Sequence, residues 1–371
     1  MMTTTAMKAA LLASALLIAS QASAQQTQKF TATKANEYGL TYTLPVTMLD
    51  ISIETERIDR EPGEFYNYSK KYLGIDPVMT PSTEWKLRSV TVNPRGEAPG
   101  DNAERYLIKF KAGSTPFVLL TSDGLPVSIN SEIDYQPAPV PNPVPVNVKP
   151  EISVLKRPEA RQAMTEDMLQ AQSTAKRAEL AAARIFELRQ SRSDIISGQA
   201  DNMPSDGAAM QLVLDNLARQ EAALTAMFTG TEIHSTEVHT VPFRPDGDID
   251  GDSQTATVGR ISVVDGLVES DDLSGEPVTI TIDIIERGEM PVNDKGETLR
   301  FPKNGVAYNI PGRARVTAGY MGRELFSQEM EIAQLGITFG LDPAIFTDKK
   351  APASLLFYPT TGAIKELSTA K

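Results

Sequence analysis

Residues 164–185 read MTEDMLQAQSTAKRAELAAARI, and this stretch decides the fold that the sequence predicts. Small and apolar residues recur in it at alternating steps of four and three, as they do in the seam of two packed helices. These residues are Met164, Met168, Ala171, Ala175, Ala178, Ala182 and Ile185. The pattern predicts one helix from about residue 158 to residue 197, which would be roughly 60 Å long at 1.5 Å per residue.

A second amphipathic helix is expected to end at Gly230. Gly198 ends the first helix, residues 203–206 make the turn, and Ser205 or Asp206 caps the second helix. The apolar face of the second helix consists of Met210, Val213, Leu214, Leu217, Leu224 and Phe228. Two amphipathic helices joined by a short loop predict a long antiparallel helical hairpin.

The sequence on both sides of this hairpin has the period-2 alternation of half-buried strands. Apolar and polar residues alternate around Leu49, Ile51 and Ile53 before the hairpin, and over residues 278–284 after it. Short strands separated by Gly, Pro and Asp turns are typical of a sandwich or a small barrel. The predicted fold class is therefore α+β and mainly β, with two β-sandwich or barrel-like domains and the helical hairpin inserted between them.

Changes in composition set the predicted boundaries. We expect an N-terminal β domain at residues 25–135, the hairpin at 151–230 and a C-terminal β domain at 231–371. Six prolines between residues 137 and 150 mark residues 136–150 as a stiff linker, because proline cannot donate to a sheet ladder or to a helix interior.

A short helix is expected between Pro62 and Gly74. Phe65, Tyr68 and Tyr72 would lie on one of its faces. An aromatic face of this kind can bind a sugar, but it more often packs on a sheet, so we assign it to the core of the N-terminal domain.

The N-terminus has the three parts of a secretory signal. Lys8 precedes an apolar run over residues 9–20, and Ala22-Ser23-Ala24 is typical of a signal-peptidase site. The alternative is a retained membrane anchor, but a spanning helix needs about 20 apolar residues. We therefore predict that residues 1–24 are a cleaved signal peptide. The mature chain, without a transmembrane span, is expected in the periplasm or at the outer-membrane periphery.

Composition narrows the classes of function. The chain has no cysteine, which excludes disulfides, thiolate metal sites and a cysteine nucleophile. Its formal net charge of −12 argues against nucleic acid and against anionic lipid as partners.

The loop DGDIDGD at residues 246–252 resembles the first half of a calcium loop. The oxygen ligands would come from Asp246, Asp248, Asp250 and Asp252. Thr257 stands where such a loop needs a bidentate glutamate, and strand-like sequence replaces the flanking helices. A bound Ca²⁺ ion and a solvated hairpin tip both remain open, and no other cofactor is expected.

Charged residues gather near the end of the first helix and in the loop after it. Arg189 and Arg192 of the helix and Asp201 of the loop could form a polar tip that binds a partner. Alternatively these ions satisfy the helix ends, since cations favour a helix C-terminus. The projecting hairpin is in either case the element through which we expect an envelope protein partner to bind.

Catalytic motifs of the common hydrolase and nucleotide-binding types are absent from the sequence. The two histidines, His234 and His239, are five residues apart, which on a strand places them on opposite faces. Glu232 would share a face with His234, and Glu237 with His239. Use of either histidine in metal binding or catalysis is not favoured by this spacing.

Several segments, in order along the chain, resemble a known family. They are Tyr38–Pro45, Pro62–Phe65, Tyr72-Leu73, Ile185–Pro204, Phe228–Gly230, Arg260–Ser262, Asn304–Tyr308, Ala333–Gly336 and Thr361–Ala363. Together they resemble the domain-of-unknown-function family 4831 of the Bacteroidetes envelope. The proline-rich and Asp-rich segments are not part of that pattern. The resemblance implies an exported protein of a Gram-negative envelope, and it implies no reaction, because the family has no assigned activity.

These observations favour a non-catalytic exported cell-envelope protein that acts in protein binding or assembly. One alternative is an envelope polysaccharide hydrolase that uses paired carboxylates, for which the cluster Glu269, Asp271 and Asp272 is a candidate. The other alternative is a calcium-dependent binding module.

Overall fold

The computed structural model describes residues 39–100, 103–109, 117–136, 162–202, 206–249, 251–302, 305–348 and 351–369. The signal peptide predicted at residues 1–24 and residues 137–150 of the predicted linker lie outside these ranges. The described chain is mainly β and is divided among several sheets.

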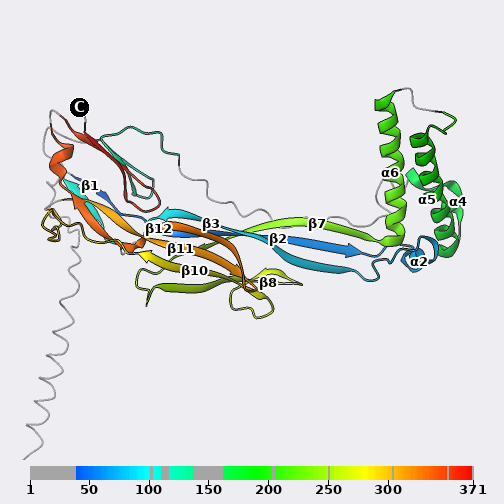
Figure 1. Ribbon diagram of the computed structural model, residues 1–371, viewed down its shortest axis with the longest axis horizontal. Coiled ribbons are helices and arrows are strands. Elements are labelled where there is room, and N and C mark those ends of the chain that lie inside the picture. The colour runs from blue at the N-terminus through cyan, green and yellow to red at the C-terminus, as the bar shows by residue number, and fades with distance from the viewer. Residues whose placement is uncertain are drawn as a thin grey trace, which may run out of the picture.

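A sheet of three long antiparallel strands, which we call the arm, runs along much of the length of the molecule (Figure 1). Its central strand is β2 (Val46–Glu61), with β3 (Ser82–Glu97) on one side and β7 (Thr231–Phe243) on the other. The pairing of β2 with β7 extends from Leu49 opposite Phe243 to Glu61 opposite Thr231. The backbone groups of β2 are thus paired on both sides over nearly its whole length.

One end of the arm packs on a five-stranded sheet of order β12-β11-β10-β8-β9. These strands are β8 (Ser253–Ser262), β9 (Gly266–Val268), β10 (Glu276–Glu286), β11 (Val306–Tyr320) and β12 (Arg323–Leu341). Leu49, Ile51 and Ile53 of β2 are fully buried against residues of β10 such as Ile280 and Ile282. The alternation predicted for both strands therefore sends one row of side chains from each into a shared core.

Two smaller sheets adjoin this core. One has the order β14-β13-β6-β5 and the other pairs β1 with β4. Their strands are β1 (Gly39–Tyr42), β4 (Tyr106–Lys109), β5 (Val118–Leu120), β6 (Pro126–Ile129), β13 (Ala353–Phe357) and β14 (Ile364–Thr369). The buried Tyr42 hydroxyl donates to the Ala307 carbonyl of β11 at 2.9 Å. We call these two sheets, with the five-stranded sheet, the body.

The sheet topology differs from the predicted division into separate β domains at residues 25–135 and 231–371. β2 pairs with β7, and β6 pairs with β13, so strands from both halves of the chain share sheets. A strand that gives up such a partner would leave a row of backbone groups unpaired. Strands from the two halves of the chain are therefore shared between the arm and the body, and the boundaries predicted at residues 135 and 231 do not separate two sets of sheets.

Gln334 of β12 fixes the beginning of β2 to the body. Its side-chain oxygen accepts from the Thr47 backbone nitrogen at 2.9 Å, and its side-chain nitrogen donates to the Thr47 carbonyl at 2.8 Å. The hydroxyl of Thr47, which is fully buried, accepts from the Ala333 nitrogen at 3.0 Å. The amide side chain therefore acts as a backbone partner where the two strands meet.

All α-helices of the described residues gather at the opposite end of the arm, and we call this group the head (Figure 1), whereas the short 3-10 helix η3 (Pro343–Phe346) lies in the body. The head contains the short helices η1 (Tyr66–Tyr68) and α2 (Ser69–Tyr72), and the helices α4 (Glu166–Gln170), α5 (Thr174–Ser197) and α6 (Gly207–Thr229). Ile185 and Leu188 of α5 are buried with Leu224 and Phe228 of α6 in a core that is separate from those of the body.

The single helix predicted over residues 158–197 is interrupted within the described residues. α4 ends at Gln170 because Ala171 is extended, with ψ of 123°. Ser173 then caps α5, its hydroxyl accepting from the Lys176 nitrogen at 3.2 Å. A serine that can bond its own backbone competes with a continuous helix, and this local preference overrides the heptad-like pattern.

The aromatic face of Phe65, Tyr68 and Tyr72 belongs to a core, as predicted, but it packs on the head helices and not on a sheet. The rings of Phe65 and Phe228 lie 5.3 Å apart between centroids. The segment lies at the tip of the arm, where β2 ends, so the nearest apolar surface is that of α5 and α6.

Two glycines make the junction between arm and head. A Cβ atom on Gly63 would collide with the Met227 carbonyl group at the end of α6. Gly230, between α6 and β7, has φ of +89°, which favours glycine, and a Cβ there would meet the Glu61 carbonyl. The close approach of these backbones sets where the helices sit on the arm.

We expect that Phe228→Ala destabilises the head by about 3–5 kcal/mol, because it opens a cavity in a closely packed core. Amide hydrogen exchange should become faster in α5 and α6 and stay unchanged in β10 and β11, since the head core is separate from the body core. Leu273→Ala, at a side chain that is 82% exposed, is the matched control and should change neither. Equal loss of protection in β10 would show that head and body unfold as one unit.

Candidate functional site

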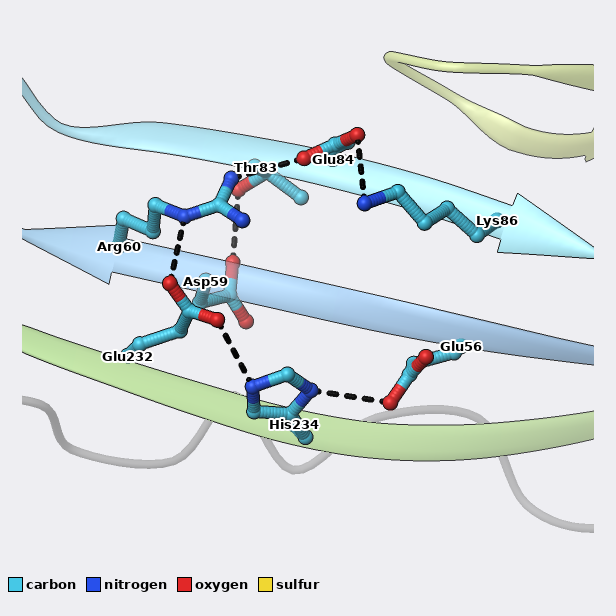
Figure 2. A network of polar contacts seen from close by, with 8 residues as sticks. All are labelled: Glu56, Asp59, Arg60, Thr83, Glu84, Lys86, Glu232 and His234. Carbon is cyan, nitrogen blue, oxygen red and sulfur yellow. Dashed lines mark hydrogen bonds and ion pairs between the residues drawn. The ribbon is translucent and has the colours of Figure 1, made fainter.

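One face of the arm carries a connected network of charged side chains (Figure 2). At its centre His234 of β7 lies between Glu56 of β2 and Glu232 of β7. Its Nδ1 atom is 2.9 Å from Glu56 Oε1, and its Nε2 atom is 2.9 Å from Glu232 Oε1. The predicted sharing of a face by Glu232 and His234 is confirmed by this contact.

Arg60 continues the network across all three strands. Its Nε donates to Glu232 at 2.7 Å, and its Nη1 donates to Glu84 of β3 at 2.8 Å. Lys86 Nζ approaches the other oxygen of Glu84 at 3.0 Å. The strands are thus crossed by alternating positive and negative groups, which favours this register over a slipped one.

The geometry at His234 favours the charged form of its ring. Ionised carboxylates only accept hydrogen bonds, so both ring nitrogens must donate, and only the imidazolium does so. For the same reason the carboxylates of Glu56 and Glu232 raise the pKa of His234 above its ordinary value, with Glu56 the larger cause. The hydrogen bond from Arg60 lowers the pKa of Glu232, and hydrogen bonds from Arg60 and Lys86 lower that of Glu84.

This network is suited to holding strands together and not to acid–base chemistry. A general acid at neutral pH needs a carboxyl group of raised pKa, whereas Glu84 and Glu232 are held ionised by their cations. The two nitrogens of His234 face different carboxylates, and within the described residues no three His, Asp or Glu side chains are grouped as a metal site.

The Asp-rich loop lies between β7 and β8. Asp246 accepts from the Gln254 side chain at 2.7 Å, and the guanidinium of Arg287 donates to the carbonyls of Gly247 and Ile249. Asp250 lies outside the described residues. The carbonyl of Asp252 accepts from the Ile284 nitrogen. These contacts do not test the hypothesis of a calcium site formed by Asp246, Asp248, Asp250 and Asp252.

The arginines predicted to bind a partner are in contact with α6. Arg189 Nε lies 2.6 Å from one oxygen of Glu221, and Arg192 Nη1 lies 2.9 Å from the other. Asp201 is exposed in the turn after α5 and takes no part in this contact. Sequence reasoning missed Glu221, because its partners lie about thirty residues away and only the packing of α5 on α6 brings them together.

Large apolar side chains are exposed on the head helices. Phe186 and Ile196 of α5 are 52% and 68% exposed, and Leu212 of α6 is 64% exposed. Leu169 of α4 is 69% exposed. A contiguous apolar patch marks an interaction surface, whereas apolar side chains exposed singly are ordinary.

The carboxylates proposed for a hydrolase, Glu269, Asp271 and Asp272, are exposed. Asp272 accepts from the Ser274 nitrogen at 2.8 Å in an exposed turn, and this bond lowers its pKa. A cavity of about 400 Å³ in the body has Glu104 as the single carboxylate among its described lining residues. Glu104 accepts from the Tyr106 hydroxyl at 2.8 Å, and burial raises the pKa of that tyrosine to about 12.

A family model described as Domain of unknown function (DUF4831) matches residues 38–365. No curated protein and no solved structure matches the chain. Among the described residues no helix is both long enough and apolar enough to cross a membrane.

We expect Glu56→Gln and Glu232→Gln each to lower the pKa of His234 toward its ordinary value of 6.5. The raised pKa means that protonation stabilises the folded arm fully below pH 6.5, and that this contribution is lost as pH rises through the raised value. A proton NMR titration of the His234 ring measures this directly. Glu54→Gln, on the same strand but bonded to Ser89, is the control and should leave the titration unchanged. An unchanged pKa in Glu56→Gln would contradict the network.

Calorimetric titration of the purified protein with Ca²⁺ should give no saturable heat. The position that needs a bidentate glutamate is Thr257, which is paired with Thr279 inside the β8–β10 ladder, and Arg287 already places a cation on the loop carbonyls. A saturable heat that disappears in Asp248→Asn would instead establish the calcium site.

Proposed function

The chain belongs to the domain-of-unknown-function family DUF4831. We propose that it is a non-catalytic cell-envelope protein that acts in protein binding or assembly. In this proposal the head is the part that contacts a protein partner. The observation that carries it is the exposure of Phe186, Ile196 and Leu212 on helices that the arm holds away from the body (Figure 1).

The energetic argument concerns these exposed side chains. Covering apolar surface is worth about 25 cal/mol for each Å² removed from water. A partner that covered Phe186 and Leu212 would gain this free energy without first having to unfold the head, whose core lies on the other side of the helices. Aromatic and large aliphatic anchors of this type dominate the free energy of many protein interfaces.

The placement of the head supports the same proposal. The arm is a twisted three-stranded sheet with its central strand paired on both sides, so it holds the helices at a distance from the body. A partner could therefore reach the helices without contacting the body. We propose that α5 and α6 work as an antiparallel helical hairpin in this role.

Arg189 and Arg192 then serve the binding surface indirectly. Both are engaged with Glu221, which is 14% exposed, and this shared contact fixes α5 against α6. In this proposal the apolar side chains provide the contact itself, and Asp201 is exposed in the turn after α5.

We further propose that the protein acts outside the cytoplasm, in the periplasm or at the outer-membrane periphery. The signal-like residues 1–24 support this location, and the absence of cysteine from the sequence and the net charge of −12 are compatible with it. Fractionation of cells, with N-terminal sequencing of the mature protein, tests it, and a mature chain that begins at Gln25 is the expected result.

Photo-crosslinking in living cells tests the binding role. A photoreactive phenylalanine analogue at position 186 or 212 should give a discrete crosslinked protein partner. The same analogue at Val264 or Leu273, which are 69% and 82% exposed on the body, should not. Adducts that form equally at all four positions, or on the body alone, would contradict a role for the head.

Phe186→Ser combined with Leu212→Ser should reduce the yield of the head-specific complex about tenfold, since two exposed anchors are lost. Substitutions at exposed positions change the free energy of unfolding by about 0.5 kcal/mol or less, so thermal unfolding should be unaffected. Val264→Ser combined with Leu273→Ser is the matched control.

A further inference from the structure

The head contains a cavity of about 170 Å³ that the proposed function does not use. It lies among α4, α5, the end of α6 and the segment that leaves β2. Its lining residues are Glu64, Phe65, Met164, Met168, Leu169, Arg177, Ala181 and Met227. Leu169, which is 69% exposed, marks the side on which the cavity reaches the surface.

The size and lining of this cavity suit one bulky apolar side chain. A dry cavity of about 150 Å³ lined by apolar residues can hold a benzene molecule, which approximates the side chain of leucine or phenylalanine. Met164, Met168 and Met227 supply flexible, polarisable walls, and methionine adapts to differently shaped apolar groups. Met168 and Met227 are 4% and 1% exposed, so the cavity walls belong to the buried core of the head.

An ion pair closes one side of the cavity. Arg177 Nη1 of α5 lies 2.9 Å from Glu64 Oε1. The other carboxylate oxygen, Oε2, and the guanidinium Nε are both buried and have no hydrogen-bond partner in the described part of the chain. The oxygen can only accept a hydrogen bond and the Nε–H can only donate one.

A buried polar atom without a partner is unfavourable, and a ligand that supplies the partner removes that cost. The terminal torsion of a glutamate side chain is soft, so a small rotation turns Oε2 of Glu64 toward the cavity. A peptide backbone offers the complement of this pair, an N–H for Glu64 and a C=O for Arg177.

We propose that this cavity is an anchor site for a partner polypeptide, which inserts one leucine, methionine or phenylalanine side chain between the methionines. The backbone amides that flank the inserted residue bond to Glu64 and Arg177. This inference rests on the proposed function, because it names the chemistry of the segment that the head receives. The surface positions Phe186 and Leu212 then contact the remainder of the same partner.

The probe is N-acetyl-leucinamide, which carries one leucine side chain between two amides. It is added to the full-length protein labelled with ¹³C at the methionine methyl groups. We expect saturable NMR shifts of Met164, Met168 and Met227 at about millimolar concentration, as a ligand of this size allows. Met321 and Met330 of the body should not shift. N-acetyl-alaninamide, which lacks the branched side chain, should bind at least tenfold more weakly.

Two variants separate the parts of the site. Ala181→Leu fills the cavity and should abolish the probe-induced shifts of Met164, Met168 and Met227. Arg177→Met removes the hydrogen-bond donor but keeps an apolar side chain. It should weaken the binding of N-acetyl-leucinamide at least fivefold. The binding of toluene, a second probe that has no amide, should not change. If Ala181→Leu disturbs the packing of the head, Arg177→Met still tests the proposal. The proposal is overturned if the probe shifts none of the three methionines or shifts Met321 and Met330 equally.

Crosslinking from position 186 in the Ala181→Leu protein distinguishes this proposal from the broader one. Reduced crosslinking together with probe binding to the wild type supports both. Undiminished crosslinking without probe binding overturns the anchor site and leaves the binding role of the head standing. Probe binding without any crosslinked partner overturns the binding role and leaves a small-molecule site.

Discussion

The pairing of β2 with β7 is the interaction on which the rest of this structure depends. It joins residues 49–61 to residues 231–243. The segment between them in the sequence, which includes the head helices, therefore starts and ends at this pair of strands. A two-stranded ribbon of β2 and β3 alone would be only marginally stable in water. The third strand pairs the free edge of β2 and turns a ribbon into a sheet that can hold the head away from the body.

The arm also has two chemically different faces, and this difference explains how it can leave the body. Near the body, one face carries the buried row Leu49, Ile51 and Ile53. Farther out, on the opposite face, Glu56 pairs with His234 of β7 and Arg60 pairs with Glu232 of β7. Each exposed ion pair contributes little free energy, about 0–1 kcal/mol, but charged side chains on such a sheet discourage its pairing with other chains.

The segments that carry the family resemblance meet at the places where separate parts of the chain must approach closely. Gly63 follows β2, and Gly230 follows α6, and both lie at the junction of arm and head. Gln334 lies at the other end, where its amide holds Thr47 of β2. These positions fix where the arm begins and where it ends. The sequence predicted the head only in part. Ser173 interrupts the predicted helix, and the contact of Arg189 and Arg192 with Glu221 was not predicted.

The sequence by itself determined the local periods of this protein: the strand alternation at residues 49–53 and 278–284, the two helical segments before and after residue 200, and the pairing of Glu232 with His234 on one face. These follow from side-chain spacing over a few residues, which the backbone geometry fixes. Only the tertiary structure decided that β2 lies between β3 and β7, that Glu56 reaches His234, and that the helices stand at the far end of an arm. Those contacts join residues as much as about 190 positions apart, and their free energy depends on complementary surfaces that no single segment contains.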